Sequence, residues 1–158
     1  MKIFPKNTED FIKSPPSEIR LILVYGSDEG LVRETSARIG KTIVSDLSNP
    51  FLVSEISGDN ISQDSAQLID EALAISMIGG RRLIRVRDAT DNIVKPLEIL
   101  LETDKVEAIT ILQSGALNPR SKLRKLIEKS PLSAAIACYP DDYLSLQSLI
   151  TSLSLIHI

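Results

Sequence analysis

Short apolar runs and longer amphipathic stretches alternate along most of the chain. Five apolar runs predict buried strands, at residues 20–26, 51–58, 81–88, 107–115 and 134–140. The stretches that follow them predict five helices, at residues 31–47, 62–78, 93–103, 118–130 and 141–153. Strands that alternate with helices are joined by right-handed crossovers. The pattern therefore predicts an α/β fold, a five-stranded, mostly parallel sheet with helices on both faces.

Individual residues support these helices. Four apolar residues share one face of the first helix, with Ser36 in the gap between them: Val32, Ile39, Ile43 and Leu47. The pair Gly79-Gly80 is suited to close the second helix, because glycine readily adopts the left-handed C-cap conformation. The fourth helix is capped by Asn118 or Ser121.

The first predicted strand leads through "GSDEG" into a helix, which is where a nucleotide-binding protein keeps its phosphate loop. A working loop reads G-x-x-x-x-G-K-[ST], since backbone N–H groups and the lysine hold the phosphates. Counted from Gly26, the last three positions of the motif hold Leu31, Val32 and Arg33. The residues that bind phosphate and magnesium are therefore missing.

The loop also carries two carboxylates. Asp28 and Glu29 would repel a phosphate, yet they suit the N-terminus of a helix, whose dipole favours anions by about 0.3–1 kcal/mol each. We therefore expect a degenerate phosphate loop, formed by Gly26, Asp28, Glu29 and Gly30, with no bound nucleotide and no cofactor. Nucleotide hydrolysis is not expected either, because Arg85 and Arg87 interrupt the strand that ends at Asp88.

The composition of the chain excludes some classes of site. The chain of 158 residues has one cysteine, Cys138, so it has neither an intrachain disulfide nor a thiolate metal site. No apolar run approaches the roughly 20 residues of a membrane helix, and no signal-peptide core is present, so we expect a cytoplasmic protein without membrane contact. Residues 1–80 hold 7 Lys and Arg against 12 Asp and Glu (−5), and residues 81–158 hold 11 against 9 (+2).

The residues alone leave three functions open. The chain could be a non-catalytic interaction subunit or a small P-loop nucleotide-binding enzyme with an aberrant loop. It could also be a receiver-like α/β interaction domain, in which Asp28 or Asp88 would accept a phosphate.

Four segments, in this order and at these intervals, resemble one family: "LVYGSDEGLVRE", "SMIGGRRLIRVRDATD", "NPRSKLRKLIE" and "CYPDD". They are similar to the N-terminal domain of the delta subunit of bacterial DNA polymerase III, of the alphaproteobacterial type, over residues 20–149. The resemblance implies a P-loop NTPase/AAA+-like fold that has lost nucleotide binding. It also implies that residues 1–140 form the clamp-binding domain and that residues 141–152 begin a helical lid domain.

The resemblance further implies a clamp-loader subunit in DNA replication, without catalysis of its own, within a DNA-directed DNA polymerase (nucleotidyltransferase) holoenzyme. Its partners would be the sliding clamp (beta subunit), the gamma/tau and delta-prime subunits, and primed DNA through the assembled complex. The clamp-binding residues would be Ser76, Met77 and Ile78. From Ala72 to Ile78 only Ser76 is polar, which leaves a surplus apolar face for a partner. Alternatively, Met77 and Ile78 close the core.

A basic stretch in the predicted fourth helix has two interpretations: Arg120, Lys122, Arg124, Lys125 and Lys129. It is either a solvated face or a surface for DNA or another subunit, where phosphate contacts would be sensitive to salt. Arg85 and Arg87 share one face of a strand and are expected to pair with carboxylates. Cys138, Tyr25 and Tyr139 are expected to be packing residues.

The last six residues, "LSLIHI", break the amphipathic pattern and match the translation of a transposon-end adapter used in sequencing libraries. We expect residues 153–158 to be a non-native tail. The only histidine, His157, lies in this tail and receives no role.

Overall fold

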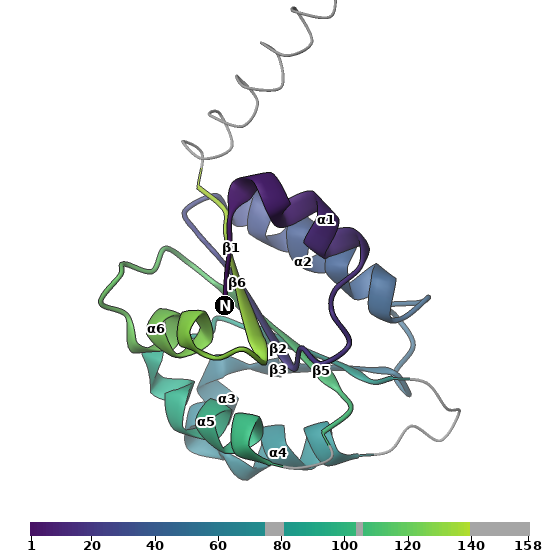
Figure 1. Cartoon of the computed structure of the whole chain (residues 1–158). Helices are drawn as coiled ribbons and strands as arrows, with labels where there is room; N and C mark the ends of the chain where they lie inside the picture. Colours follow the sequence, from purple (N-terminus) through teal and green to yellow (C-terminus); the bar gives the residue numbers. More distant parts are fainter. Residues whose placement is uncertain (75–80, 104–105, 140–158) are drawn as a thin grey trace, which may run out of the picture.

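The computed structural model describes residues 1–74, 81–103 and 106–139 (Figure 1). In this part of the chain the strands are β1 (Lys2–Ile3), β2 (Leu21–Tyr25), β3 (Val53–Ser57), β4 (Leu83–Arg87), β5 (Ile109–Ser114) and β6 (Ser133–Ala137). The α-helices are α1 (Thr8–Lys13), α2 (Glu29–Ile43), α3 (Gly58–Gln63), α4 (Ala66–Leu73), α5 (Val94–Glu102) and α6 (Lys122–Lys129). Two 3₁₀ turns, η1 (Pro5–Asn7) and η2 (Asp91–Ile93), precede α1 and α5.

The strands form one sheet in the order β1-β6-β2-β5-β4-β3, and every neighbouring pair is parallel. The α/β fold with a parallel sheet is confirmed, but the described sheet has six strands where the sequence predicted five. The additional strand is β1, which pairs with β6 through Lys2 and Ala135 and through Ile3 and Ile136. It is only two residues long, too short to show the alternation by which a strand is recognised.

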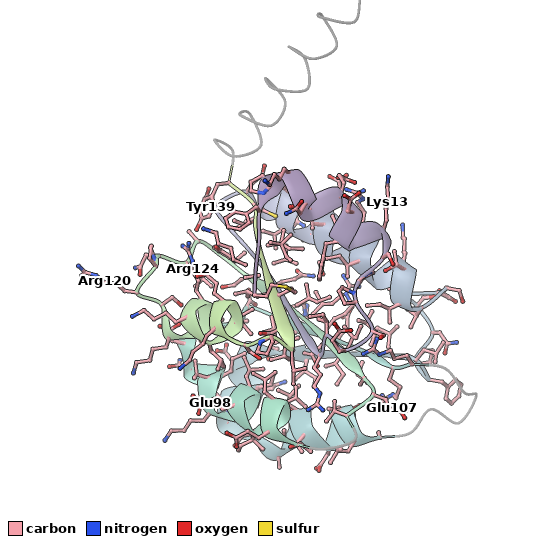
Figure 2. The ribbon with its side chains drawn as sticks, in the orientation of Figure 1. Lys13, Glu98, Glu107, Arg120, Arg124 and Tyr139 are labelled. Atoms are coloured by element: carbon pink, nitrogen blue, oxygen red, sulfur yellow. The ribbon has the colours of Figure 1, made fainter. Side chains whose placement is uncertain are left out.

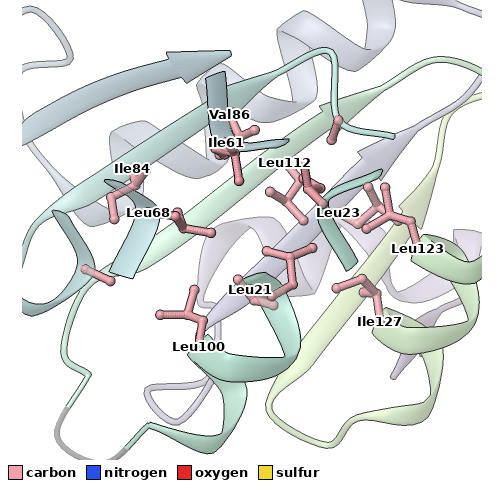
Figure 3. Close-up of a cluster of buried hydrophobic side chains, with 14 of the residues drawn as sticks. Leu21, Leu23, Ile61, Leu68, Ile84, Val86, Leu100, Leu112, Leu123 and Ile127 are labelled. Carbon is pink, nitrogen blue, oxygen red and sulfur yellow. The ribbon is translucent and has the colours of Figure 1, made fainter. Parts of the chain in front are cut away.

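Helices cover both faces of the sheet, as predicted (Figure 1). Leu21, Leu23 and Tyr25 of β2 belong to the core cluster that also holds side chains of α3, α4, α5 and α6. Ile22 and Val24 belong to the cluster on the other face, with side chains of α1 and α2. Because successive side chains of a strand point to opposite faces, β2 is buried on both sides. Figure 3 shows Leu21 and Leu23 among the helical side chains of the first cluster.

The first predicted helix is shorter than expected at its C-terminal end. Val32 and Ile39 are buried on the face that the pattern indicated, and Ser36 is buried between them. The helix nevertheless stops at Ile43, and Leu47 packs against the core from the following turn. That turn is held by side-chain bonds, since Asp46 accepts hydrogen bonds from both the N–H and the hydroxyl of Ser48.

The prediction of one helix over residues 62–78 is wrong. Ser57 caps α3, which begins at Gly58, and this helix ends at Gln63. A second helix, α4, runs over Ala66–Leu73, and Ala74 is already extended. The polar run from Ser62 to Ser65 explains the break, because such side chains compete with the backbone for hydrogen bonds and favour helix ends. Residues 75–78 and the predicted glycine cap lie outside the described residues.

The remaining helices agree with the pattern more closely. Pro96 lies in the first turn of α5, where a missing N–H is tolerated. Ser121, not Asn118, caps α6 and accepts a hydrogen bond from the N–H of Arg124. The predicted helix over residues 141–153, the lid boundary and the tail over 153–158 all lie outside the described residues. No helix in the described ranges has the length and apolar character needed to cross a membrane.

Candidate functional site

The connection between β2 and α2 occupies the place of a phosphate loop, but it is very short. The strand ends at Tyr25 and the helix begins at Glu29, so only Gly26, Ser27 and Asp28 connect them. Asp28 is the N-cap: its Oδ1 accepts a hydrogen bond from the N–H of Leu31 at 3.1 Å. A carboxylate of the chain itself therefore occupies the anion-favouring end of α2.

Main-chain contacts close this loop over the carboxyl ends of the neighbouring strands. The N–H of Gly26 donates to the carbonyl of Gly115 after β5, at 3.2 Å, and the N–H of Asp28 donates to the carbonyl of Cys138 after β6, at 3.3 Å. Gly26 has φ +149°, and a Cβ atom there would lie 2.0 Å from the carbonyl oxygen of Cys138. The backbone of the loop is thus held against the segments that follow β5 and β6.

Beside the loop, a cavity of about 600 Å³ lies between α1, α2 and the end of β6. Its lining includes the acidic residues Glu9, Asp28 and Glu34. Arg38 is the one cation among the described lining residues, and both of its terminal nitrogens donate to the carboxylate of Glu9, at 3.0 and 2.6 Å. The hydrogen bond from Arg38 lowers the pKa of Glu9. The excess of negative charge in this lining does not favour binding of a phosphate.

Cys138 also lines this cavity and is a packing residue, as predicted. Its side chain is 3% exposed, and its Sγ lies 3.8 Å from the hydroxyl of Thr35. Burial raises the pKa of the thiol to about 11. Tyr25 and Tyr139 pack edge to face, with their ring centroids 5.9 Å apart.

The basic residues on and before α6 separate into two groups. Arg124 turns inward: it donates to Glu128 at 2.8 Å and to the carbonyl of Leu117 at 3.0 Å, and it lies over the ring of Tyr25. The exposed members are Arg120, Lys122, Lys125 and Lys129. Figure 2 shows Arg120 extending away from the body of the domain. Arg124 is therefore committed to internal contacts, and only the exposed group is available to a partner.

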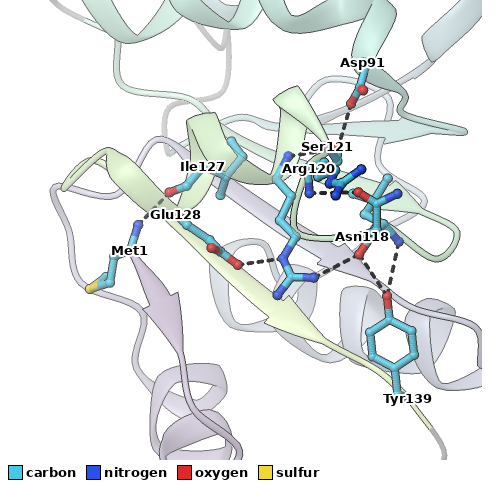
Figure 4. Close-up of polar contacts among 10 residues, drawn as sticks. Met1, Asp91, Asn118, Arg120, Ser121, Ile127, Glu128 and Tyr139 are labelled. Carbon is cyan, nitrogen blue, oxygen red and sulfur yellow. Dashed lines mark hydrogen bonds and ion pairs between the residues drawn. The ribbon is translucent and has the colours of Figure 1, made fainter.

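The loop between β5 and α6 is fixed by residues from other elements (Figure 4). The hydroxyl of Tyr139 contacts both the N–H and the carbonyl of Leu117, at 3.1 and 3.2 Å. Asp91 in η2 accepts hydrogen bonds from the Ser121 hydroxyl at 2.7 Å and from the N–H of Leu123 at 3.1 Å. The start of α6 thus has a cap in addition to the Ser121 hydroxyl. This cap is the carboxylate of Asp91, from the segment after β4.

The end of β4 differs from a magnesium-binding strand. Asp88 has φ +55°, and its carbonyl approaches Gly58 so closely that a Cβ atom there would be 2.3 Å away. Arg85 pairs with Glu55 of β3 at 3.4 Å, as the sequence predicted. Arg87 is exposed. In the described part of the chain, no three His, Cys, Asp or Glu residues are grouped so that they could hold a metal ion.

The predicted clamp-binding residues Ser76, Met77 and Ile78 lie outside the described residues. On the near side, α4 ends at Leu73, whose side chain is 45% exposed. On the adjacent helix α5, Ile99 is 51% exposed. The sequence argument placed Met77 and Ile78 on a continuous helix, and this support is lost because the helix ends before Ala74.

Two solved structures share this fold. The DNA clamp loader delta protein of Bacillus subtilis aligns with a TM-score of 0.64 and 21% identity, over 86% of this chain and 42% of that one. A DNA polymerase III gamma subunit-related protein of Thermotoga maritima aligns with a TM-score of 0.56 and 19% identity, over 86% of this chain and 46% of that one. The chain thus has the same α/β fold with a parallel sheet as these two proteins.

A curated relative makes the resemblance more specific. The probable DNA polymerase III subunit delta of Rickettsia prowazekii (strain Madrid E) is 24% identical over 133 residues. The match covers 84% of this chain and 39% of the relative, so the chain spans well under half the length of that relative. No model of a protein family matches the chain. The resemblance to delta subunits, first indicated by the sequence motifs, is confirmed by this relative.

Proposed function

We propose that the chain is the clamp-binding part of a delta subunit, a clamp-loader component of the DNA polymerase III holoenzyme that acts in DNA replication. The observation that carries the proposal is the fold shared with the Bacillus subtilis clamp loader delta protein over 86% of the chain. The relative named as a delta subunit supports it. The subunit has no catalysis of its own, and the nucleotidyltransferase activity belongs to the holoenzyme.

The β2–α2 loop does not bind nucleotide in this proposal. The positions for the second glycine, the lysine and the hydroxyl residue of the motif hold Leu31, Val32 and Arg33, and Asp28 already caps the helix. The hydrogen bond from Gly26 to Gly115 also holds the loop against the end of β5. These features argue against the alternative of a small P-loop nucleotide-binding enzyme. The receiver-like alternative loses Asp28 as phosphate acceptor, because its carboxylate is the N-cap.

The clamp contact is proposed at Ser76, Met77 and Ile78. Two exposed apolar side chains support a partner surface near this segment: Leu73, the last residue of α4, and Ile99 of the adjacent helix α5. Binding would favour the open form of the clamp ring, because Met77 and Ile78 would have more contact with an open ring interface than with a closed one. A ligand shifts an equilibrium by the difference in its affinity for the two states.

The wider assembly is also a proposal. Gamma/tau and delta-prime would complete the loader, and ATP would be bound by other subunits. Arg120, Lys122 and Lys125 are exposed and would approach primed DNA or a neighbouring subunit, whereas Arg124 is withdrawn from this role by its contacts with Glu128 and Leu117. It follows from this proposal that the protein acts in the cytoplasm.

The test measures clamp binding and folding on the same proteins. Surface plasmon resonance with an immobilised bacterial sliding clamp should show saturable binding of the chain. The variant Met77→Ala/Ile78→Ala should lose about 100-fold or more in affinity, since each hot-spot side chain contributes roughly 1–2 kcal/mol or more. Its urea unfolding should stay close to that of the native chain.

A matched control is Phe4→Ala, which removes a side chain that is 52% exposed just after β1, at the opposite edge of the sheet. This variant should bind the clamp like the native chain. A Met77→Ala/Ile78→Ala protein that unfolds early and still binds the clamp would show that these residues close the core instead.

A further inference from the structure

The outward face of α6 is formed by lysines. On the inward face, Leu123 and Ile127 are completely buried and lie among the side chains of the core (Figure 3). The residues of α6 that are exposed to solvent are all lysines: Lys122, Lys125 and Lys129. They follow one another at intervals of three and four residues, so they lie in one row along the helix. We call this row the lysine face.

The acidic residue of α6 does not neutralise the lysine face. Glu128 is bound elsewhere, because its carboxylate accepts a hydrogen bond from Nε of Arg124 at 2.8 Å (Figure 4). Arg124 is itself held by the carbonyl of Leu117 at 3.0 Å. None of the ion pairs within the described ranges includes a residue of the lysine face. Its three charges are therefore open to a partner.

The start of the lysine face is fixed by Asp91, the acidic neighbour of Lys122. The carboxylate of Asp91 accepts hydrogen bonds from the Ser121 hydroxyl at 2.7 Å and from the N–H of Leu123 at 3.1 Å. The hydrogen bond from Ser121 is the largest cause that lowers the pKa of Asp91, and the charge of Lys122 is a smaller one. Asp91 thus holds the helix in place through the backbone and Ser121.

A fourth cation lies at the N-terminal end of this row. Arg120 precedes α6 by two residues, is exposed, and extends away from the body of the domain (Figure 2). Its backbone is fixed, because its N–H donates to the side-chain oxygen of Asn118 at 2.8 Å. The guanidinium group of Arg120 therefore adds to the positive charge at the start of the lysine face.

The chemistry of this surface fits the phosphates of DNA better than it fits a protein. Protein interfaces are depleted of lysine and depend on apolar or aromatic anchors. The large apolar side chains that are exposed in the described ranges lie outside α6. Surfaces that bind DNA are rich in positive charge, and lysine binds a phosphate as a point charge.

The length of the lysine face also suits a DNA strand. From Lys122 to Lys129 the helix rises by about 10 Å, at about 1.5 Å per residue. Phosphates of one strand follow one another at about 3.4 Å along the axis of B-DNA, so the row spans about three of them. Lysine side chains are long enough to adjust to the exact positions of these phosphates.

We propose that the lysine face binds the phosphate backbone of duplex DNA, with Arg120 as a further contact. The choice of DNA as the natural partner rests on the proposed function, which left DNA and a neighbouring subunit open for this helix. Contacts to the backbone carry no sequence information, so binding should be independent of DNA sequence and should weaken as the salt concentration rises. Arg124 takes no part, because Glu128 and Leu117 hold its side chain.

The test measures binding of the 158-residue chain to a fluorescein-labelled DNA duplex by fluorescence anisotropy, at salt concentrations from about 50 to 200 mM. The variant Lys122→Gln/Lys125→Gln/Lys129→Gln should bind at least about tenfold more weakly at the lowest salt concentration. Its plot of log affinity against log salt should be less steep by about 2 to 3.

Two measurements show that charge causes this loss. Glutamine and lysine have similar helix propensities, so the glutamine variant should unfold in urea like the native chain. The variant Lys122→Arg/Lys125→Arg/Lys129→Arg keeps the three charges and should bind the duplex like the native chain. Loss of binding in the arginine variant would refute a contact that depends on charge.

A matched control removes three lysines from other elements. Lys13 and Lys41 lie on α1 and α2, which cover the other face of the sheet, and Lys6 lies in η1. All three are exposed. The variant Lys6→Gln/Lys13→Gln/Lys41→Gln therefore changes the net charge as much as the glutamine variant of the lysine face. It should bind the duplex within about twofold of the native chain. An equal loss in both variants would refute the lysine face as the binding site.

The outcomes separate this inference from the proposed function. Affinity for the immobilised sliding clamp, measured on the same proteins, should not change in the glutamine variant of the lysine face. A native chain that does not bind the clamp refutes the proposed function, and the DNA measurement still decides the phosphate contact. A native chain that binds the clamp but not the duplex at low salt refutes only the DNA contact. Polyglutamate that displaces the chain as well as unlabelled DNA does would also refute it, in favour of an acidic protein partner.

Discussion

Gly26 occupies the tightest position in the candidate site. Its φ of +149° is rarely adopted by other residues, and the backbone of Cys138 occupies the space that a side chain would need. Gly26→Ala should therefore lower the free energy of unfolding by more than about 2 kcal/mol. Urea unfolding followed by circular dichroism measures this loss.

The control for this substitution is Gly30→Ala in the first turn of α2. The methyl group of an alanine there would have Oδ1 of Asp28 as its nearest neighbour, at 3.6 Å, which is an ordinary contact. Because alanine has the higher helix propensity, Gly30→Ala should stabilise the domain by up to about 1 kcal/mol. Equal stability of the two variants would contradict the close approach of Gly26 to the backbone of Cys138.

Cys138 offers a second test at the scale of a single residue. A thiolate is the reactive form of cysteine, and burial raises the pKa of this thiol to about 11. The native protein should therefore react slowly with Ellman's reagent at about pH 8, at a rate set by unfolding. The same protein in urea should react at once. Complete reaction of the folded chain within seconds would show that Cys138 is accessible.

At the scale of elements, Asp91 connects the segment after β4 to the start of α6. It accepts hydrogen bonds from Ser121 and Leu123, and the hydrogen bond from Ser121 is the main cause that lowers its pKa. Asp91→Ala should cost about 1 kcal/mol of stability, as the loss of a helix cap does. Asp91→Asn should cost less, because it keeps an acceptor oxygen.

The pH dependence of this cap has a defined sign. A carboxyl group whose pKa is lowered by folding stabilises the protein above its unfolded pKa, and this stabilisation is lost as the pH falls through the folded pKa. The stability difference between the native chain and Asp91→Asn should be constant near pH 7 and shrink below about pH 4. Urea unfolding across this range tests it, and a difference that grows in acid would be contrary to the expected sign.

The elements also show what a single sequence can reveal. Buried strands such as β2 were predictable, because an uninterrupted apolar run has few other uses in a parallel sheet. The break between α3 and α4 was not predictable from the spacing of apolar residues. It depends on capping by Ser57 and on polar side chains, and neither affects that spacing. Likewise, β1 owes its place to pairing with β6, a contact distant in sequence.

The candidate site was predictable to a similar extent. The acidic cap of α2 followed from the residues near Gly26, because a carboxylate directly before a helix is a local signal. The hydrogen bonds of Arg20 and Arg82 to carbonyls at the ends of α5 and α4 were not predictable, since these carbonyls belong to elements distant in sequence. A basic residue directly before a buried strand was the only local sign. The clamp-binding residues Ser76, Met77 and Ile78 remain a prediction.

At the scale of the whole molecule, the two edges of the sheet have different characters. At the carboxyl edge, where α/β proteins usually bind ligands, Asp28 caps α2, and the N–H groups of Gly26 and Asp28 bond to the segments that follow β5 and β6. Near the amino edge, Arg20 donates to the carbonyl of Thr103 after α5, and Arg82 donates to that of Glu71 in α4. Leu73 at the end of α4 is 45% exposed. Our proposal places a protein partner at the amino edge and expects no nucleotide at the carboxyl edge.

Nucleotide binding provides the last test, and its cause can be separated into charge and geometry. Calorimetry with millimolar ATP and Mg²⁺ should show no saturable heat for the native chain. If repulsion by Asp28 and Glu29 were the only obstacle, Asp28→Asn/Glu29→Gln would gain binding, because asparagine still caps α2 while the charges are gone. We expect no binding to this variant either, since the three-residue connection and the bond from Gly26 to Gly115 remain. Saturable binding to the native chain would refute the degenerate loop, and binding to the variant alone would assign the effect to charge.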